Sequence, residues 1–279
     1  MSDFATRLAA RIGRYGPLCV GIDPHAPLLQ ACGLPDSAEG ALALGQRIIR
    51  ALDFELAIVK PQSAFFERHG SAGIRALEQL MAEARARDLL VLLDAKRGDI
   101  DSTGEAYAEA YFRPGTSVRA DALTWHVYLG FAALRRALEF AAREGGGAFI
   151  VVRSSNPEGA ALQTAVLEGK TVSQRVCEEI TAFNQRLHAT AALGSVGAVV
   201  GATCDDADAM VAALPRSYIL APGVGAQGAT LADIVRRMPS ARGRVLPSVS
   251  RAIFANGTHE AEVRSTLRAL RDEARRMWD

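Results

Sequence analysis

Short apolar runs alternate with helical segments eight times along the chain, and this alternation constrains the fold more than any other feature. The runs lack the regular polar positions of a strand with one solvated face, so strands buried on both faces are expected, as in a parallel sheet. Eight such units in 279 residues predict an α/β fold, a single (β/α)8 or TIM barrel, which typically takes about 250 residues. A doubly wound open sheet is the alternative, but no G-x-G-x-x-G follows the first run. The expected strands are 18–22, 56–60, 89–94, 121–125, 147–152, 197–201, 217–221 and 244–249, and the expected helices are 40–53, 72–87, 104–112, 131–143, 172–188, 206–214, 229–237 and 258–277.

Domain organisation follows from the same pattern. No linker or short repeat indicates a second domain, so residues 1–279 are interpreted as one barrel domain. The stretch 155–172 is longer than a tight turn requires, which leaves room for a loop insertion at the barrel mouth. Because the chemistry of such barrels lies at the carboxyl ends of the strands, reactive residues are sought there.

Composition and charge exclude several classes of protein. With 32 basic and 31 acidic residues the net charge is +1, so a nucleic-acid partner held by charge is not expected. No apolar run approaches the roughly 20 residues that span a bilayer, and the N-terminus lacks the apolar core of a signal peptide, so a soluble, cytoplasmic protein is expected. The four cysteines lie far apart without a C-x-x-C pair, which favours reduced thiols and no metal site. They are Cys19, Cys32, Cys177 and Cys204.

Lysine is rare in this chain, which makes each lysine informative. Only Lys60, Lys96 and Lys170 occur among the 32 basic residues. A lysine ammonium can give up a proton at physiological pH, whereas arginine cannot. Lys170 lies in a polar stretch and is expected to be solvated, but Lys60 and Lys96 end predicted strands and are candidates for chemistry.

The densest cluster of charges is the segment D-A-K-R-G-D-I-D-S-T, residues 94–103. Because side chains alternate along a strand, Asp94 and Lys96 should face the same side at the barrel mouth. Gly98 permits a sharp exit, so Asp99 could reach the same region or a neighbouring subunit. Lys60 from the adjacent strand would complete a row of alternating charges, either as a catalytic site or as a structural ion-pair network.

The last two loops carry a candidate phosphate site. Gly223, Gly225 and Gly228 leave backbone N–H groups unobstructed after the seventh strand, and Arg251 follows the eighth. These loops are the usual phosphate site of this barrel type, although glycines in a loop can also serve only to form turns. A phosphate monoester is the expected substrate.

These motifs together resemble the orotidine 5′-phosphate decarboxylase family, in the longer of its two bacterial branches. The resemblance rests on D-A-K-R-G-D-I-D-S-T with G-I-D-P-H, V-K-P-Q, S-N-P-E-G, P-G-V-G-A-Q-G and S-V-S-R, in order from Asp23 to Arg251. It implies conversion of orotidine 5′-phosphate to uridine 5′-phosphate and CO2, the last step of de novo pyrimidine nucleotide synthesis. It also implies that neither a metal nor an organic cofactor takes part.

The resemblance assigns the catalytic roles residue by residue. Lys96 would protonate carbon 6 of the pyrimidine, and Asp94 would lie beside the departing carboxylate. Lys60 and Asp99 would complete the charged network, in a homodimer in which Asp99, Ile100 and Thr103 reach the neighbouring site. Substrate-binding residues would be Asp23, Ile100, Thr103, Ser155, Pro222, Gly223, Gln227, Ser250 and Arg251. Asp23 and Thr103, together with Lys60, would hold the ribose hydroxyls, and Ile100 would lie near the leaving CO2. Ser155 would contact the pyrimidine edge, and Gln227 and Arg251 would bind the phosphate.

Some residues depart from the family pattern. Asp101 replaces a usual glycine, Ser250 replaces a common glycine, and Trp125-His126-Val127 replaces a small-polar segment that ends in proline. Trp125 is expected to pack in the core or rim. His25 and His126 are expected to be packed or surface histidines more than substrate contacts.

Three rival functions stay open at this point. Metal-dependent enediolate enzymes share the D-x-K-x-x-D signature but need a strand-two carboxylate, where this chain has Lys60. A Schiff-base aldolase needs a neutral lysine, whereas flanking aspartates favour the charged form. A catalytically silent nucleotide-binding barrel would have no use for Lys96.

Overall fold

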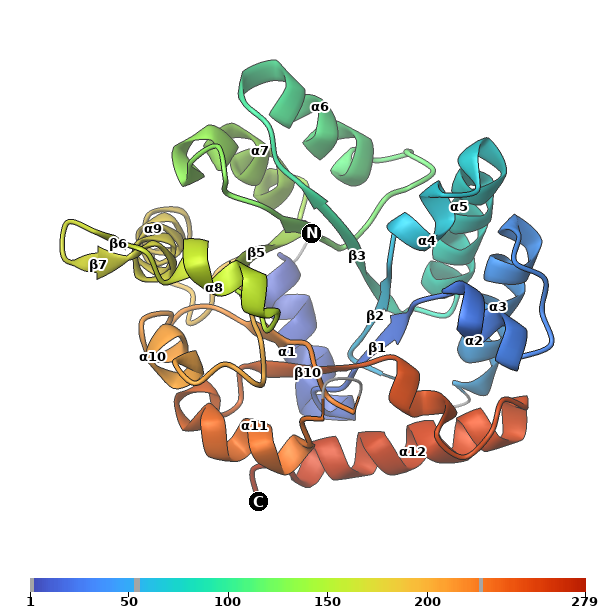
Figure 1. The fold of residues 1–279 in the computed structure, drawn as a ribbon. Helices are drawn as coiled ribbons and strands as arrows, with labels where there is room; N and C mark the ends of the chain where they lie inside the picture. Colours follow the sequence, from blue (N-terminus) through green and yellow to red (C-terminus); the bar gives the residue numbers. More distant parts are fainter. Residues whose placement is uncertain (1–2, 53–55, 226–227) are drawn as a thin grey trace.

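Eight parallel strands close into a barrel in the computed structural model, which describes residues 3–52, 56–225 and 228–279 (Figure 1). Within these residues the order around the barrel is β1-β10-β9-β8-β5-β4-β3-β2, so each barrel strand lies beside the next barrel strand along the chain. Residues 157–171, which connect β5 to β8, form short elements outside the barrel. The predicted (β/α)8 barrel is confirmed. Its strands are β1 (Cys19–Ile22), β2 (Ile58–Pro61), β3 (Leu90–Arg97), β4 (Ala122–Trp125), β5 (Gly147–Arg153), β8 (Val196–Val200), β9 (Ile219–Ala221) and β10 (Val245–Val249).

Helices cover the outside of the barrel (Figure 1). They bury one apolar face each, and the outward-pointing strand residues pack against that face. Their bounds lie within a few residues of the predicted helical segments. These helices are α3 (Ala38–Ala51), α5 (Gly70–Ala86), α6 (Asp101–Phe112), α7 (Phe131–Arg143), α9 (Val172–Leu187), α10 (Ala207–Ala212), α11 (Leu231–Arg237) and α12 (Glu260–Arg276).

The N-terminal helix α1 (Phe4–Tyr15), which the strand-helix pattern did not predict, closes the end of the barrel at which the strands begin and lies behind the strands in Figure 1. Phe4 and Leu8 are buried among the inward-pointing strand residues. Phe4 meets Phe149 edge to face at 6.1 Å between ring centroids. A Cβ on Gly147 would lie 2.1 Å from the Phe4 ring. Glycine at the start of β5 therefore leaves the space in which helix α1 packs.

Several short elements were also not predicted from the sequence. Residues 155–172 contain helix α8 (Pro157–Gln163) and the antiparallel hairpin of β6 (Val166–Leu167) and β7 (Lys170–Thr171). The hairpin projects from the barrel wall beside α9 (Figure 1). The remaining ones are α2 (Ala26–Ala31), α4 (Ala64–Glu67) and the 3-10 turns η1 (Pro239–Ala241) and η2 (Arg251–Phe254).

The four cysteines are free and buried, as predicted. Among the described residues, no group of three or more His, Cys, Asp or Glu side chains has a metal-holding arrangement. In the same part of the chain no helix combines the length and apolar character needed to cross a membrane.

Candidate active site

The candidate active site lies at the carboxyl ends of the strands, where alternate residues point into the barrel. On β2, Ile58 belongs to the inner core, so Lys60 and Gln62 follow it on the same side. On β4, Ala122 points inward and Thr124 follows it. These ends surround a cavity of about 750 Å³. Its polar lining consists of Asp23, His25, Lys60, Gln62, Asp94, Lys96, Thr124, Ser154, Ser155, Ser248, Ser250 and Arg251, and its apolar lining includes Phe65, Val151, Val199, Leu220 and Pro222.

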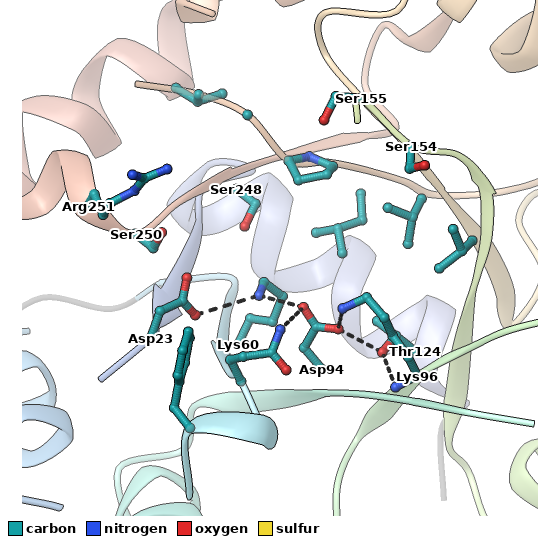
Figure 2. Close-up of a pocket in the computed structure, with 18 of the residues that line it drawn as sticks. Asp23, Lys60, Asp94, Lys96, Thr124, Ser154, Ser155, Ser248, Ser250 and Arg251 are labelled. Atoms are coloured by element: carbon teal, nitrogen blue, oxygen red, sulfur yellow. Dashed lines mark hydrogen bonds and ion pairs between the residues drawn. The ribbon is translucent and has the colours of Figure 1, made fainter. Parts of the chain in front are cut away.

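A row of alternating charges crosses the floor of this cavity (Figure 2). Lys60 Nζ lies 2.9 Å from Asp94 Oδ2, and Lys96 Nζ lies 2.5 Å from Asp94 Oδ1. Asp23 Oδ1 is 4.0 Å from Lys60 Nζ on the other side. The predicted meeting of Lys60, Asp94 and Lys96 is therefore confirmed.

Two neutral side chains complete the environment of Asp94. Thr124 Oγ1 donates to Asp94 Oδ1 at 2.9 Å, and Gln62 Nε2 donates to Asp94 Oδ2 at 3.1 Å. With the two lysines, each carboxylate oxygen accepts two hydrogen bonds, which is close to its full capacity. Asp94 is thus held in one orientation.

Lys60 and Asp94 keep their charges although both are buried. Burial by itself would lower the pKa of Lys60, but Asp94 and Asp23 outweigh it and raise this pKa above the ordinary lysine value. Burial would likewise raise the pKa of Asp94, but Lys60 and Lys96 hold it well below the usual range. Lys96 differs from both, because 41% of its side chain is exposed at the cavity mouth. Lys60 and Asp94 therefore form a buried ion pair, with the more accessible Lys96 side chain beside it.

Lys96 reaches Asp94 by an irregular backbone rather than by simple strand alternation. The pairing of β3 with β4 shifts register between Leu93 and Arg97. Lys96 itself has φ +46°, in the left-handed region that residues other than glycine rarely adopt. The predicted convergence of Asp94 and Lys96 is correct, but a bulge produces it.

The opposite end of the cavity is formed by the loops after β9 and β10. Pro222, Gly223, Ser250 and Arg251 all line the cavity. Ser250 and Arg251 lie on the Asp23 side of the cavity, away from Lys96 (Figure 2). Gly223 has φ +112°, which requires glycine at this turn. Gln227, the other predicted phosphate residue, lies outside the described residues.

Three predicted site residues do not line the cavity of their own chain. Asp99, Ile100 and Thr103 lie at and before the start of α6 and are absent from its lining. Asp99 Oδ1 accepts the backbone N–H of Ile100 at 2.8 Å, and the Ile100 side chain is 51% exposed. Asp101 has φ +45°, which gives a physical reason for the glycine usual at this position.

Neither Thr124 nor Gln62 was predicted as a site residue, although Gln62 is the last residue of the V-K-P-Q motif. Their positions were available from strand alternation, because Thr124 precedes Trp125 in a predicted strand and Gln62 lies two residues after Lys60. Trp125 is fully buried, as predicted. His25 caps α2, since its Nδ1 accepts the N–H of Leu28 at 3.2 Å, and its ring also borders the cavity. Burial lowers the pKa of His25, and Arg251 lowers it further.

Comparison with known proteins assigns the chain to a family. Residues 16–266 match the model of the "Orotidine 5′-phosphate decarboxylase / HUMPS family". The chain belongs to the orotidine 5′-phosphate decarboxylase family. A Salinispora tropica protein named orotidine 5′-phosphate decarboxylase is 46% identical over 274 residues, which cover 98% of this chain and 97% of that protein. A Myxococcus xanthus protein of the same name is 43% identical over 95% of this chain and 92% of its own length.

Structural comparison agrees with this family. A crystal structure from Streptomyces avermitilis, provisionally named orotidine 5′-phosphate decarboxylase, superposes with a TM-score of 0.91 at 42% identity and covers 99% of this chain and 95% of that one. The decarboxylase family match spans all eight barrel strands, and therefore the whole charged row.

Proposed function

We propose that this chain decarboxylates orotidine 5′-phosphate to uridine 5′-phosphate and CO2. The observation that carries the proposal is the Lys60–Asp94–Lys96 row on the floor of a cavity whose far end holds Gly223 and Arg251. A nucleoside monophosphate has the matching polarity, with a phosphate at one end and a reactive ring at the other. Membership of the decarboxylase family and the names of the relatives support this substrate.

The charged and polar residues of the cavity wall suggest where the phosphate and the ribose of the substrate bind. We assign the phosphate to Arg251 and to the backbone N–H groups of Gly223 and Ser250, and Gln227 stays a predicted phosphate residue. Asp23 and Lys60 would bind the ribose hydroxyls. In support, Asp23 Oδ1 is buried and accepts no hydrogen bond from any described residue.

The pyrimidine would lie between these groups and the charged row. Ser155 borders the cavity and would hydrogen-bond the amide edge of the ring, while Val151, Val199 and Leu220 provide an apolar surface for its faces. This arrangement directs carbon 6 and its carboxylate toward Asp94 and Lys96.

The reaction needs stabilisation of a carbanion, and the row supplies it. The bond between carbon 6 and the carboxylate carbon breaks, its electron pair stays on carbon 6, and CO2 leaves. The Lys96 ammonium becomes more strongly attracted as negative charge grows on carbon 6, gives a proton to that carbon, and is reprotonated by water. Asp94 faces the substrate carboxylate and favours its departure. Neither a metal nor an organic cofactor is required for these steps.

The proposed active unit is a homodimer. Asp99, Ile100 and Thr103 lie outside their own cavity, and Ile100, Tyr128 and Leu129 are apolar or aromatic side chains exposed by 51%, 82% and 54%. Burying Ile100, Tyr128 and Leu129 against a second copy of the chain would remove apolar area from water. The same contact would bring Asp99, Ile100 and Thr103 to the site of the neighbouring subunit.

Mixing two inactive variants tests this arrangement. In a Lys96→Ala and Asp99→Ala heterodimer, one site carries both substitutions and the other carries neither, so mixing should restore turnover. Mixed chains that form heterodimers without activity would contradict the shared site.

Lys96→Ala tests the chemistry directly. The variant should lose turnover by at least about a thousandfold, roughly 4 kcal/mol of transition-state stabilisation, and still bind uridine 5′-phosphate within about threefold of the unaltered protein. Full turnover by Lys96→Ala would refute the assigned proton donor.

A cytoplasmic location is part of the proposal and rests on the four free cysteines.

A further inference from the structure

Thr124 is a buried neutral side chain beside Asp94 and Lys96, at the Lys96 end of the charged row (Figure 2). It is the third residue of β4, follows the inward-pointing Ala122 by two, and is 1% exposed. The strand therefore fixes its hydroxyl inside the barrel at the level of Asp94.

The Thr124 hydroxyl makes hydrogen bonds to two residues of β3, Asp94 and Lys96. Its Oγ1 accepts the backbone N–H of Lys96 at 2.9 Å and donates to Asp94 Oδ1 at 2.9 Å. The direction of both bonds is determined, because a backbone N–H can only donate and an ionised carboxylate can only accept. One hydroxyl thus holds both the backbone of Lys96 and the carboxylate that its ammonium contacts.

The backbone of Lys96 needs such a support. The register shift between Leu93 and Arg97 interrupts the ladder between β3 and β4, and regular pairing returns only at Arg97 and Trp125. Lys96 lies inside this shift with φ +46°. Left-handed backbone at a residue other than glycine is strained and persists where surrounding contacts hold it. The Thr124 side chain supplies the acceptor that the regular ladder does not.

We propose that Thr124 is a positioning residue that holds the Lys96 ammonium at the distance and direction from carbon 6 that proton transfer requires. This role rests on the proposed function, since it concerns the same reaction. Thr124 acts through Lys96 and Asp94, so it sets the rate of the chemical step more than the affinity for the phosphate and ribose.

The primary test replaces Thr124 with valine, which keeps the shape and removes both hydrogen bonds. For Thr124→Val we expect kcat for orotidine 5′-phosphate to fall 10- to 100-fold, with KM within about threefold of the unaltered protein. Thr124→Ser keeps the hydroxyl and should retain kcat within about threefold. Thr266→Val is the matched control, because Thr266 is also buried and its hydroxyl also makes two hydrogen bonds, but in α12 and outside the cavity lining.

A spectroscopic readout separates positioning from general stability. With only three lysines, protein labelled with [ε-¹³C]lysine gives three signals, which lysine-to-arginine variants assign. Thr124→Val should move the Lys96 signal and leave that of Lys170, whereas Thr266→Val should move neither.

The outcomes are distinct. Unchanged kcat in Thr124→Val, an unmoved Lys96 signal, or failure of Thr124→Ser to restore turnover would each overturn the positioning role. The unaltered protein's turnover tests the proposed function separately, while the Lys96 signal reports on Thr124 whether or not turnover occurs.

Discussion

The buried pair of Lys60 and Asp94 should stabilise the fold as a unit. Their side chains are 8% and 10% exposed, and Nζ lies 2.9 Å from Oδ2. At an effective dielectric constant of about 20, this separation corresponds to roughly 6 kcal/mol of attraction before desolvation is subtracted. Among the described residues, Asp94→Asn leaves Lys60 with Asp23, at 4.0 Å, as its one acidic partner, so we expect a loss of about 3 kcal/mol in the free energy of unfolding.

The reverse substitution should be less damaging. Lys60→Met leaves Asp94 with Lys96, Thr124 and Gln62, so a loss of about 2 kcal/mol is expected. The double variant, Lys60→Met with Asp94→Asn, removes both charges of the pair, so neither stays buried without its partner. It should therefore lose only about 2 to 3 kcal/mol in total, which gives a coupling energy of about 2 kcal/mol.

Equilibrium urea unfolding at one protein concentration measures this coupling, with the fluorescence of buried Trp125 as a probe. The control is the surface pair of Lys170 and Glu178, both 51% exposed, whose cycle should give less than about 1 kcal/mol. Because the pKa of Asp94 is lowered, its contribution is lost only as pH falls below the usual carboxylate range. Because the pKa of Lys60 is raised, its contribution is lost only as pH rises above the usual lysine range. The coupling energy should therefore be constant from about pH 5 to pH 9, and a value near zero in this range would show that Lys60 and Asp94 do not stabilise the fold as a pair.

Three further predictions concern the backbone and the cavity rim. Asp101→Gly should keep kcat/KM within about tenfold, because glycine suits the φ of +45°, and a larger fall in steady-state assays would reveal a catalytic role. Gly98→Ala should lose about 1 to 3 kcal/mol in urea unfolding, since its Cβ would lie 2.5 Å from the backbone oxygen of His126, while Gly13→Ala, with open space around it, should lose none. Because the pKa of His25 is lowered by burial and by Arg251, its stabilising contribution is present above about pH 6.5 and lost as pH falls. The free energy of unfolding should thus decline less between pH 7 and pH 5 in His25→Asn than in the unaltered protein, and equal slopes would contradict this.

Much of the barrel could be predicted from the sequence because its strands are buried on both faces. Runs such as 89–94 and 147–152 have no polar alternation, and they coincide with β3 and β5 within a few residues. The meeting of Asp94 and Lys96 was also predicted correctly, although regular strand alternation is not what produces it. The bulge that achieves this, with Lys96 at φ +46°, depends on the pairing with β4 and has no local sequence signal.

Other features depend on partners distant in the sequence. Helix α1 has a local start signal, since Asp3 accepts the N–H of Thr6, but its position under the barrel depends on the contact of Phe4 with Phe149, more than a hundred residues away. Nothing in the local sequence distinguishes Thr124 from other strand residues, because its two hydrogen-bond partners, Lys96 and Asp94, lie on β3. Asp99 and its neighbours lie outside their own cavity, so their predicted roles depend on a second chain that one sequence does not specify.

The most direct test of the central claim follows the ultraviolet absorbance of orotidine 5′-phosphate with the purified protein, with and without excess EDTA. We predict conversion to uridine 5′-phosphate at the same rate in both samples, because the charged row of Lys60, Asp94 and Lys96 performs the reaction without a metal. Folded protein that leaves the substrate unchanged would contradict the decarboxylase assignment, and turnover abolished by EDTA would contradict the metal-free mechanism.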